Sequence, residues 1–304
     1  MLLKKLATAV HQPWRVVASE KLKRLAWIVP DQPYLECCYR TAVGKKLDLR
    51  NPVTYTEKLQ WLKLHDRRSV YTQMVDKAAA KEFVRSRVGD AYIIPTLGIY
   101  DSFDEIDFDV LPDQFVIKCT HDSAGLVICR DKAAFDRNAA RRKICRCLKR
   151  NFFYSGREWP YKNVPPRIIV EAYMEDSNDG ELRDYKFFTF GGEPRILYIT
   201  QGRGTDADAC ADFFDMDFNH LDLRIDHEMA PVLPHPPANF EKMKELAAEL
   251  SEGTPQLRVD FYEVNGQIYF GEMTFFHCSG YATFRPECWD ELLGSWVELP
   301  APTE

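Results

Sequence analysis

The chain has 304 residues, enough for one large α/β unit or for two lobes that share a cleft. Apolar residues make up 45% of it and the formal net charge is −6, so neither a wholly disordered chain nor a protein that relies on overall positive charge to bind nucleic acid fits the composition. The nine cysteines include no C-x-x-C motif, which argues against a disulfide scaffold or a structural zinc site and favours a reducing cytoplasm as the location. The chain also has no apolar run long enough for a membrane span.

Residues 1–28 alternate basic and apolar side chains and lack the continuous apolar segment of a secretory signal. This pattern predicts a basic amphipathic helix, which either packs on its own domain or lies on an anionic membrane surface. Packing is the favoured interpretation, because surface helices are amphipathic by default. We assign residues 1–65 to an N-terminal helical segment. In the alternative interpretation, this segment contacts the acceptor or a membrane surface. The protein is placed in the cytoplasm, with peripheral attachment to the inner face of the membrane as the alternative.

Four further helices are expected along the chain. Thr54 and Glu57 have the spacing of a capping box, which predicts a helix that runs to about Leu64. A second helix is predicted over 71–88 and ends before Gly89, a residue common just past a helix end. The other two are a basic helix over 133–150 and a helix over 239–252.

Runs of β-branched and aromatic residues predict strands, several of them joined in hairpins. The predicted strands cover 92–95, 97–100, 115–119, 126–129, 167–174, 184–190, 194–200, 257–262 and 267–275. Residues 201–239 are rich in Asp and Pro and are expected to be irregular. Strands interrupted by helices, with antiparallel hairpins, predict an α+β fold.

The last hairpin places four polar residues inside apolar strands: Arg258, Asp260, Glu272 and Thr274. A two-residue Asn-Gly turn would put the two carboxylates on opposite faces of the hairpin. A three-residue loop over 264–266 would put all four side chains on one face, together with Ile268 and Phe270. Burying two carboxylates beside a cation is costly without a metal or ligand between them, and carboxylate oxygens suit Mg²⁺. The alternative is an exposed edge hairpin whose acids face water.

Two lysines, Lys118 and Lys186, are candidate phosphate ligands, although the chain has neither a P-loop nor a G-x-G-x-x-G motif. Lys118 ends an apolar strand just before a turn of small residues, and Lys186 lies within an aromatic strand. Lys77 shares a helix face with Lys81, a pattern more typical of a solvated face. The alternative for a lysine that ends a strand is that its side chain simply extends to solvent. Glu171 ends a buried strand and is well placed to accept a hydrogen bond from an adenine amino group.

Two D-x-D pairs, Asp206 with Asp208 and Asp215 with Asp217, have the spacing by which some glycosyltransferases bind a divalent cation. His121, Asp122 and Ser123 are adjacent in sequence, and a catalytic triad is an arrangement in space that adjacency does not create.

Taken in order, the segments 54–67, 75–84, 114–125, 156–174, 184–195 and 257–275 resemble the ATP-grasp fold in its TupA-like branch, a family of teichuronopeptide and capsular polysaccharide biosynthesis. The resemblance implies two lobes that grip ATP, preceded by the N-terminal helical extension. It places the ATP-grasp domain at 66–300, with lobe 1 at about 75–172, a phosphate-covering loop at 119–126 and lobe 2 at about 173–300.

The resemblance also implies a role for individual residues. Lys77 and Lys118 would hold the ATP phosphates, and the covering loop would contribute His121, Ser123 and Gly125. The adenine would meet the hinge residues Glu171, Ala172, Tyr173 and Met174, and Asp184 would lie near the ribose. The residues implied at the reacting end are Lys186 near the terminal phosphate, Arg258 at the acyl group, and Asp260 and Glu272 on Mg²⁺, with Thr274 where most relatives have a third, Asn ligand.

The activity implied is an ATP- and Mg²⁺-dependent carboxylate–amine ligase that forms an amide through an acyl phosphate. The expected partners are a uronic-acid-containing polysaccharide of the cell wall or capsule, or its lipid-linked precursor, and an amino acid or short peptide; no nucleic acid partner is expected. The first alternative is a glycosyltransferase of polysaccharide biosynthesis with a D-x-D metal site. The others are a non-catalytic nucleotide-binding module and transfer of the phosphoryl group to a sugar hydroxyl.

Overall fold

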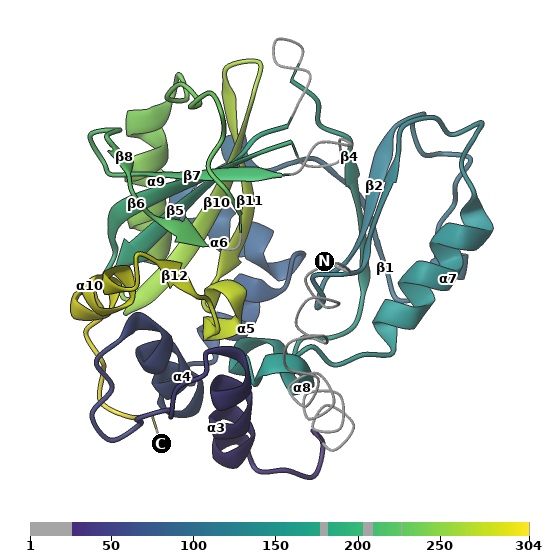
Figure 1. Ribbon diagram of the computed structural model, residues 1–304. Helices are drawn as coiled ribbons and strands as arrows, with labels where there is room; N and C mark the ends of the chain where they lie inside the picture. Colours follow the sequence, from purple (N-terminus) through teal and green to yellow (C-terminus); the bar gives the residue numbers. More distant parts are fainter. Residues whose placement is uncertain (1–25, 177–181, 203–208, 226, 304) are drawn as a thin grey trace.

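The computed structural model describes residues 26–176, 182–202, 209–225 and 227–303 (Figure 1). Most of the predicted basic amphipathic stretch, residues 1–25, therefore lies outside the described residues. Among the residues that are described, no helix is long and apolar enough to cross a membrane.

Eight α-helices and four short 3₁₀ helices are described. The α-helices are α3 (Asp31–Ala42), α4 (Tyr55–His65), α5 (Val70–Val75), α6 (Ala79–Val88), α7 (Arg137–Leu148), α8 (Phe153–Gly156), α9 (Phe240–Ser251) and α10 (Cys288–Trp296). The 3₁₀ helices are η1 (Asp90–Tyr92), η2 (Phe103–Glu105), η3 (Trp159–Tyr161) and η4 (His277–Gly280).

The capping box predicted at the start of α4 is confirmed. The amide of Glu57 donates to Oγ1 of Thr54 at 3.3 Å, and the amide of Thr54 donates to Oε2 of Glu57 at 3.1 Å. The single helix predicted over 71–88 is wrong, because the chain leaves the helical conformation at Asp76 and forms two helices. The carboxylate of Asp76 accepts from the amide of Ala78 and from Arg167, which stabilises this break.

The smaller of the two main sheets has four antiparallel strands in the order β1 (Thr96–Tyr100), β4 (Ile168–Ala172), β2 (Phe115–Cys119), β3 (Leu126–Cys129). One face of this sheet is covered by α7 (Figure 1), and a separate apolar core forms between them around Phe115, Ile117 and Ile144. Because side chains alternate along a strand, Val116 and Lys118 of β2 point to the opposite, uncovered face.

The larger sheet has six antiparallel strands in the order β11 (Gln267–Thr274), β10 (Gln256–Val264), β5 (Asp184–Phe190), β6 (Glu193–Gln201), β7 (Cys210–Phe214), β8 (His220–Leu221). A two-stranded sheet joins β12 (Phe284–Arg285) to β9 (Arg224–Ile225). The prediction that 201–239 is irregular is wrong where β7, β8 and β9 form. Tertiary packing stabilises strand β7, since Phe213 stacks on Tyr198 of β6 with ring centroids 4.5 Å apart.

Helices α5 and α6, which lie at the predicted start of lobe 1 at about residue 75, pack on the larger sheet. Tyr71, Met74 and Val84 belong to the same core as Phe187 and Leu257 of the six-stranded sheet. The chain therefore passes from the core of the larger sheet to the separate core of the smaller sheet only after these helices, where it enters β1.

The β10–β11 hairpin combines a two-residue turn with a bulge. Asn265 and Gly266 both have positive φ, and Val264 pairs with Gln267. Phe261 then pairs with Phe270, but Asp260 pairs with Glu272, so Gly271 is an extra residue and the register shifts by one. Directly paired residues point to the same face, so the two carboxylates face the same side, opposite the Phe261–Phe270 pair.

Neither predicted register is correct as a whole. The short turn is the one observed, but the bulge at Gly271 places Asp260 and Glu272 on one face, as the longer loop had required. Ile268 and Phe270, expected on that same face, belong to the apolar core instead.

Candidate active site

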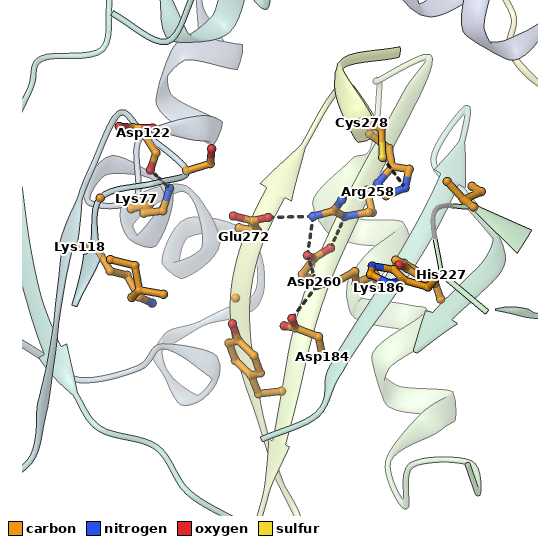
Figure 2. Close-up of a pocket in the computed structure, with 18 residues that line it drawn as sticks. Lys77, Lys118, Asp122, Asp184, Lys186, His227, Arg258, Asp260, Glu272 and Cys278 are labelled. Carbon is orange, nitrogen blue, oxygen red and sulfur yellow. Dashed lines mark hydrogen bonds and ion pairs between the residues drawn. The ribbon is translucent and has the colours of Figure 1, made fainter. Parts of the chain in front are cut away.

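A cavity of about 390 Å³ lies between the two main sheets (Figure 2). Lys77, Lys118 and Asp122 line it from the side of the smaller sheet, and the charged residues of β5, β10 and β11 face them from the larger sheet. The charged and polar residues that line it are Lys77, Lys118, Asp122, Ser123, Asp184, Lys186, Tyr198, His227, Arg258, Asp260, Tyr262, Glu272 and His277.

Arg258 is the centre of the polar network on the larger sheet. Its Nε and Nη2 donate to the two carboxylate oxygens of Asp260, each at 2.7 Å, and Nη2 also donates to Oε1 of Glu272 at 2.8 Å. Burial lowers the pKa of Arg258, but Asp260 and Glu272 outweigh it and hold the pKa above its usual value. The guanidinium is therefore a fixed positive charge at the base of the cavity.

His277 supplies the fourth contact of Arg258. Nη1 of the arginine lies 2.8 Å from Nδ1 of His277, and since guanidinium nitrogens only donate, Nδ1 is the acceptor. Burial and then the Arg258 charge lower the pKa of His277 well below its usual value, so the ring is neutral and its proton is on Nε2. Nε2 faces Sγ of Cys278 at 3.4 Å. No role is predicted for His277 from the sequence, because nothing in the pattern around it distinguishes it from a structural histidine.

Lys186 lies between two carboxylates of neighbouring strands. Its Nζ is 2.9 Å from Oδ2 of Asp184 and 2.8 Å from Oδ2 of Asp260. The second contact follows from the pairing of β5 with β10, which sets Lys186 directly opposite Asp260. The structure thus brings together five residues of the predicted site: Asp184, Lys186, Arg258, Asp260 and Glu272.

On the smaller sheet, Glu171 lies between two lysines. Oε1 is 2.5 Å from Nζ of Lys81 and Oε2 is 2.6 Å from Nζ of Lys118. Burial raises the pKa of the Glu171 carboxyl, but Lys118 and Lys81 outweigh it and hold the pKa below its usual value. In this arrangement each oxygen of the carboxylate is paired with a lysine, and the role expected for it at adenine stays a prediction.

Lys81 is a functional candidate that sequence reasoning missed. Its position on a helix face suggested a solvated side chain, yet Nζ also donates to the carbonyl of Ile94 at 2.7 Å and to Oγ1 of Thr96 at 2.9 Å. These partners lie at or just before the start of β1. The residue pattern of the helix itself does not indicate this contact.

The loop between β2 and β3 contributes Ser123 and Gly125 to the wall of the cavity. Nζ of Lys77 donates to the carbonyl of Asp122 in this loop at 3.1 Å. The third predicted loop ligand, His121, does not line the cavity. Its ring is buried away from the cavity, with Nε2 beside the carbonyls of Cys147 at 3.3 Å and Arg150 at 3.1 Å.

Four other predicted site residues lie outside the cavity wall. Ala172 and Tyr173 line a separate surface hollow, and Met174, which follows them, does not line the cavity. Thr274 reaches the site only indirectly, because its hydroxyl donates to Oε1 of Glu272 at 3.2 Å.

The D-x-D pairs receive no support as a metal site. Asp206 and Asp208 lie outside the described residues. The carboxylate of Asp215 accepts from the amides of Asp217 and Asn219, at 3.0 and 2.8 Å, and so holds the turn between β7 and β8.

The donor set on β10 and β11 fits a magnesium ion that also has ligands from elsewhere. Asp260 and Glu272 offer hard carboxylate oxygens on one face, and both hydrogen bonds of Glu272 fall on Oε1. Among the described residues, no group of three or more His, Cys, Asp or Glu side chains is arranged to hold a metal. Such an ion would therefore complete its coordination with water or phosphate oxygens.

Comparisons with known proteins agree with this architecture. A family model described as TupA-like ATPgrasp matches residues 57–298. No curated protein sequence gave a significant match.

Among solved structures, a D-alanine–D-alanine ligase from Bacillus anthracis complexed with ATP is 14% identical, with a TM-score of 0.38 over 66% of this chain and 53% of that one. A biotin carboxylase–β,γ-ATP complex from Campylobacter jejuni is 13% identical, with a TM-score of 0.42 over 75% of this chain and 47% of that one. A RimK domain ATP-grasp protein from Sphaerobacter thermophilus is 12% identical, with a TM-score of 0.41 over 75% and 69%. The chain thus spans about half the length of the first two structures, and similarities this distant do not identify a substrate.

Proposed function

Since this chain belongs to the TupA-like ATP-grasp family, we propose that it is an ATP- and Mg²⁺-dependent ligase that joins a carboxylate to an amine. The match over residues 57–298 confirms the predicted family and the α+β ATP-grasp fold. The ligase activity, the substrates, the magnesium ion and the roles of the site residues belong to the proposal.

The observation that carries the proposal is the distribution of charge across one cavity. Lys118 of the smaller sheet and Lys77, between α5 and α6 beside the β2–β3 loop, face it from one side, while Arg258, Asp260 and Glu272 face it from the larger sheet (Figure 2). Lysines suit the phosphate chain, and the two carboxylates suit a divalent cation beside its terminal phosphates. The polar network on β10 and β11 would then lie next to the reacting phosphoryl group.

The reaction proposed has two balanced steps. A carboxylate oxygen of the acceptor attacks the γ-phosphorus of ATP, which forms an acyl phosphate and releases ADP. The amine then attacks the acyl carbon and loses a proton, and phosphate leaves as the amide forms. Lys118, Lys186 and Arg258 would offset the charge that develops in both steps, and removal of one such preorganised contact typically costs about two to three orders of magnitude in rate.

Asp260 and Glu272 are the residues that would hold magnesium in this scheme. Bound there, the ion would neutralise phosphate charge and fix the orientation of the phosphoryl group. Both oxygens of Asp260 now accept from Arg258 or Lys186, so these cations would share the carboxylate with the metal or move toward the phosphates.

For the substrates, we propose a uronic acid of a cell-surface polysaccharide, or of its lipid-linked precursor, as the carboxylate, and an amino acid or short peptide as the amine. The family resemblance supports this choice. A lipid-linked acceptor would also place the enzyme at the inner face of the membrane.

The test supplies Mg-ATP with a panel of uronic acids and amino acids and follows ADP, phosphate and the mass of the product. The proposal predicts one pairing that yields ADP, phosphate and an amide in equal amounts. Consumption of a UDP- or GDP-sugar without ATP would support the glycosyltransferase instead. ATP binding without ADP release under any pairing would support a non-catalytic module, and a phosphorylated sugar without free phosphate would indicate phosphoryl transfer to a hydroxyl.

A further inference from the structure

Helix α7 and the residues just after it form the most basic surface of the described chain. Residues 137–150 contain seven Lys or Arg and no Asp or Glu, while the whole chain carries −6, so all other residues together carry −13. All seven basic side chains are exposed. The helix turns only its small and apolar face, with Ala140, Ile144 and Cys147, toward the sheet.

Few of these charges are neutralised within the protein. Arg141 pairs with Asp104 at 2.7 Å, and Arg137 lies 3.7 Å from Asp109. The other five form no ion pair with a described acidic residue: Arg142, Lys143, Arg146, Lys149 and Arg150. Arg142 and Arg146 are also spaced four residues apart within α7, an arrangement of like charges that destabilises a helix. Such a surface is most stable against an anionic partner.

An exposed apolar side chain flanks these cations. Val110 is 74% exposed in the loop before β2, and Lys132, next to α7, donates to the carbonyls of Asp109 and Leu111 in the same loop. Ile128, on the edge strand β3, is also exposed, but it pairs with Val116 and so points to the face of the sheet away from α7. A groove runs between β3 and α7, but its only basic lining residue is Lys143.

We propose that the exposed face of α7, with Arg142, Arg146 and Lys149 at its centre, docks this protein on an anionic lipid bilayer. The cations lie on a convex helix surface, which suits a flat array of lipid phosphates. A soluble polyanion would need cations along a groove, and the groove beside α7 is apolar. Val110 is placed at the flank of the charged face, where an exposed apolar side chain can enter the headgroup region. Binding is therefore electrostatic, and it weakens as salt rises.

The test measures co-sedimentation of the full chain with vesicles of phosphatidylcholine that contain about one third phosphatidylglycerol, against vesicles of phosphatidylcholine alone. We expect binding to the anionic vesicles only, lost at high salt. The variant R142E/R146E/K149E should bind at least about 100-fold more weakly, given the attraction of each basic residue near an anionic surface. The matched control K45E/K242E/R285E makes the same change in net charge at exposed basic residues outside α7 and should bind like the unmodified protein.

Two results would overturn the proposal. Equal vesicle binding by the α7 variant and the unmodified protein would assign the contact elsewhere, for example to the basic N-terminal stretch. Binding of soluble polygalacturonate, but not of anionic vesicles, would assign the surface to an anionic polymer. Thermal unfolding and ATP binding, both measured without vesicles, show that the variants are folded and that their nucleotide site is intact.

Discussion

Arg258 shows how strongly the candidate site depends on individual residues. The side chain is buried and hydrogen-bonds to three others, with Nε and Nη2 on Asp260, Nη2 also on Glu272, and Nη1 on His277. Removing one partner from such a buried charged network usually costs about 3–5 kcal/mol, because the remaining charge loses both water and its counter-ion. The geometry around Arg258 is therefore well fixed before any substrate binds.

His277 should position Arg258 without taking part in the chemistry. Replacing it with leucine leaves Nη1 without its acceptor, so we expect a lower kcat for the ligase reaction with little change in the KM for ATP. Glutamine offers a carbonyl oxygen in a similar place and should restore much of the rate. Steady-state kinetics of H277L and H277Q test this prediction, and equal rates for H277L and the unmodified protein would contradict it.

Glu171 should couple the position of Lys118 to pH. Its folded pKa lies below the usual value, so its ion pairs stabilise the protein above the usual carboxyl pKa of about 4.3, and this stability is lost as the pH falls through the folded pKa. We expect E171Q to be less stable than the unmodified protein at neutral pH and to bind ATP more weakly, since Lys118 loses its anchor.

The check is chemical denaturation of both proteins at several pH values. The difference in the free energy of unfolding should shrink as the solution becomes strongly acidic. A difference that stays constant from neutral to strongly acidic pH would contradict the role given to the Glu171 charge.

At the scale of the elements, the β10–β11 hairpin decides whether the site exists. The bulge at Gly271 turns Glu272 to the same face as Asp260. A side chain at Gly271 would place its Cβ 3.1 Å from both the carbonyl oxygen of Asp260 and the ring of Tyr262. The close approach of the two strands at this point thus favours glycine.

Replacing Gly271 with valine should therefore reduce both stability and activity. We expect a loss of about 1–3 kcal/mol in the free energy of unfolding, typical of overpacking, and a fall in ligase rate because Glu272 moves relative to Asp260. Valine at Tyr269, a half-buried position in β11 outside the bulge, is the matched control. If G271V kept the activity of the unmodified protein, the bulge would not be what brings the carboxylates together.

Features set by nearby residues could be predicted from the sequence, and features set by distant contacts could not. The capping box at Thr54 was predicted because its hydrogen bonds join residues three apart. The sequence allows two registers for the last hairpin, since the bulge depends on hydrogen bonds between strands. For the same reason the helix pattern predicts a solvated Lys81, although this side chain is held by Glu171, about ninety residues further along the chain.

The site residues divide in the same way. Asp260, Glu272 and Arg258 were predicted because charges inside apolar strands are conspicuous in any sequence. His121 and Glu171 are residue types that suit a nucleotide site, so the sequence alone predicts them as site residues. In the structure His121 contacts α7 and Glu171 contacts α6, and the sequence next to each residue does not indicate these partners.

At the scale of the whole molecule, the cavity is closed by residues from both main sheets, so a ligand that binds there should stabilise both. We expect Mg-ATP to raise the melting temperature, since a ligand at about 100 times its Kd stabilises the folded state by about 2.7 kcal/mol. Chelating the magnesium should remove most of this shift, and K118M should reduce it. An equal shift with ATP in the presence and absence of magnesium would contradict the assignment of Asp260 and Glu272 as metal ligands.

The most direct test of the proposed chemistry follows the oxygen atoms of the acceptor. A uronic acid with ¹⁸O in both carboxylate positions is incubated with the amine, Mg-ATP and the protein, and the released phosphate is analysed by mass spectrometry. Attack of the carboxylate on ATP predicts phosphate that carries one ¹⁸O atom. Amide formation accompanied by wholly unlabelled phosphate would contradict an acyl phosphate and, with it, the mechanism proposed for this site.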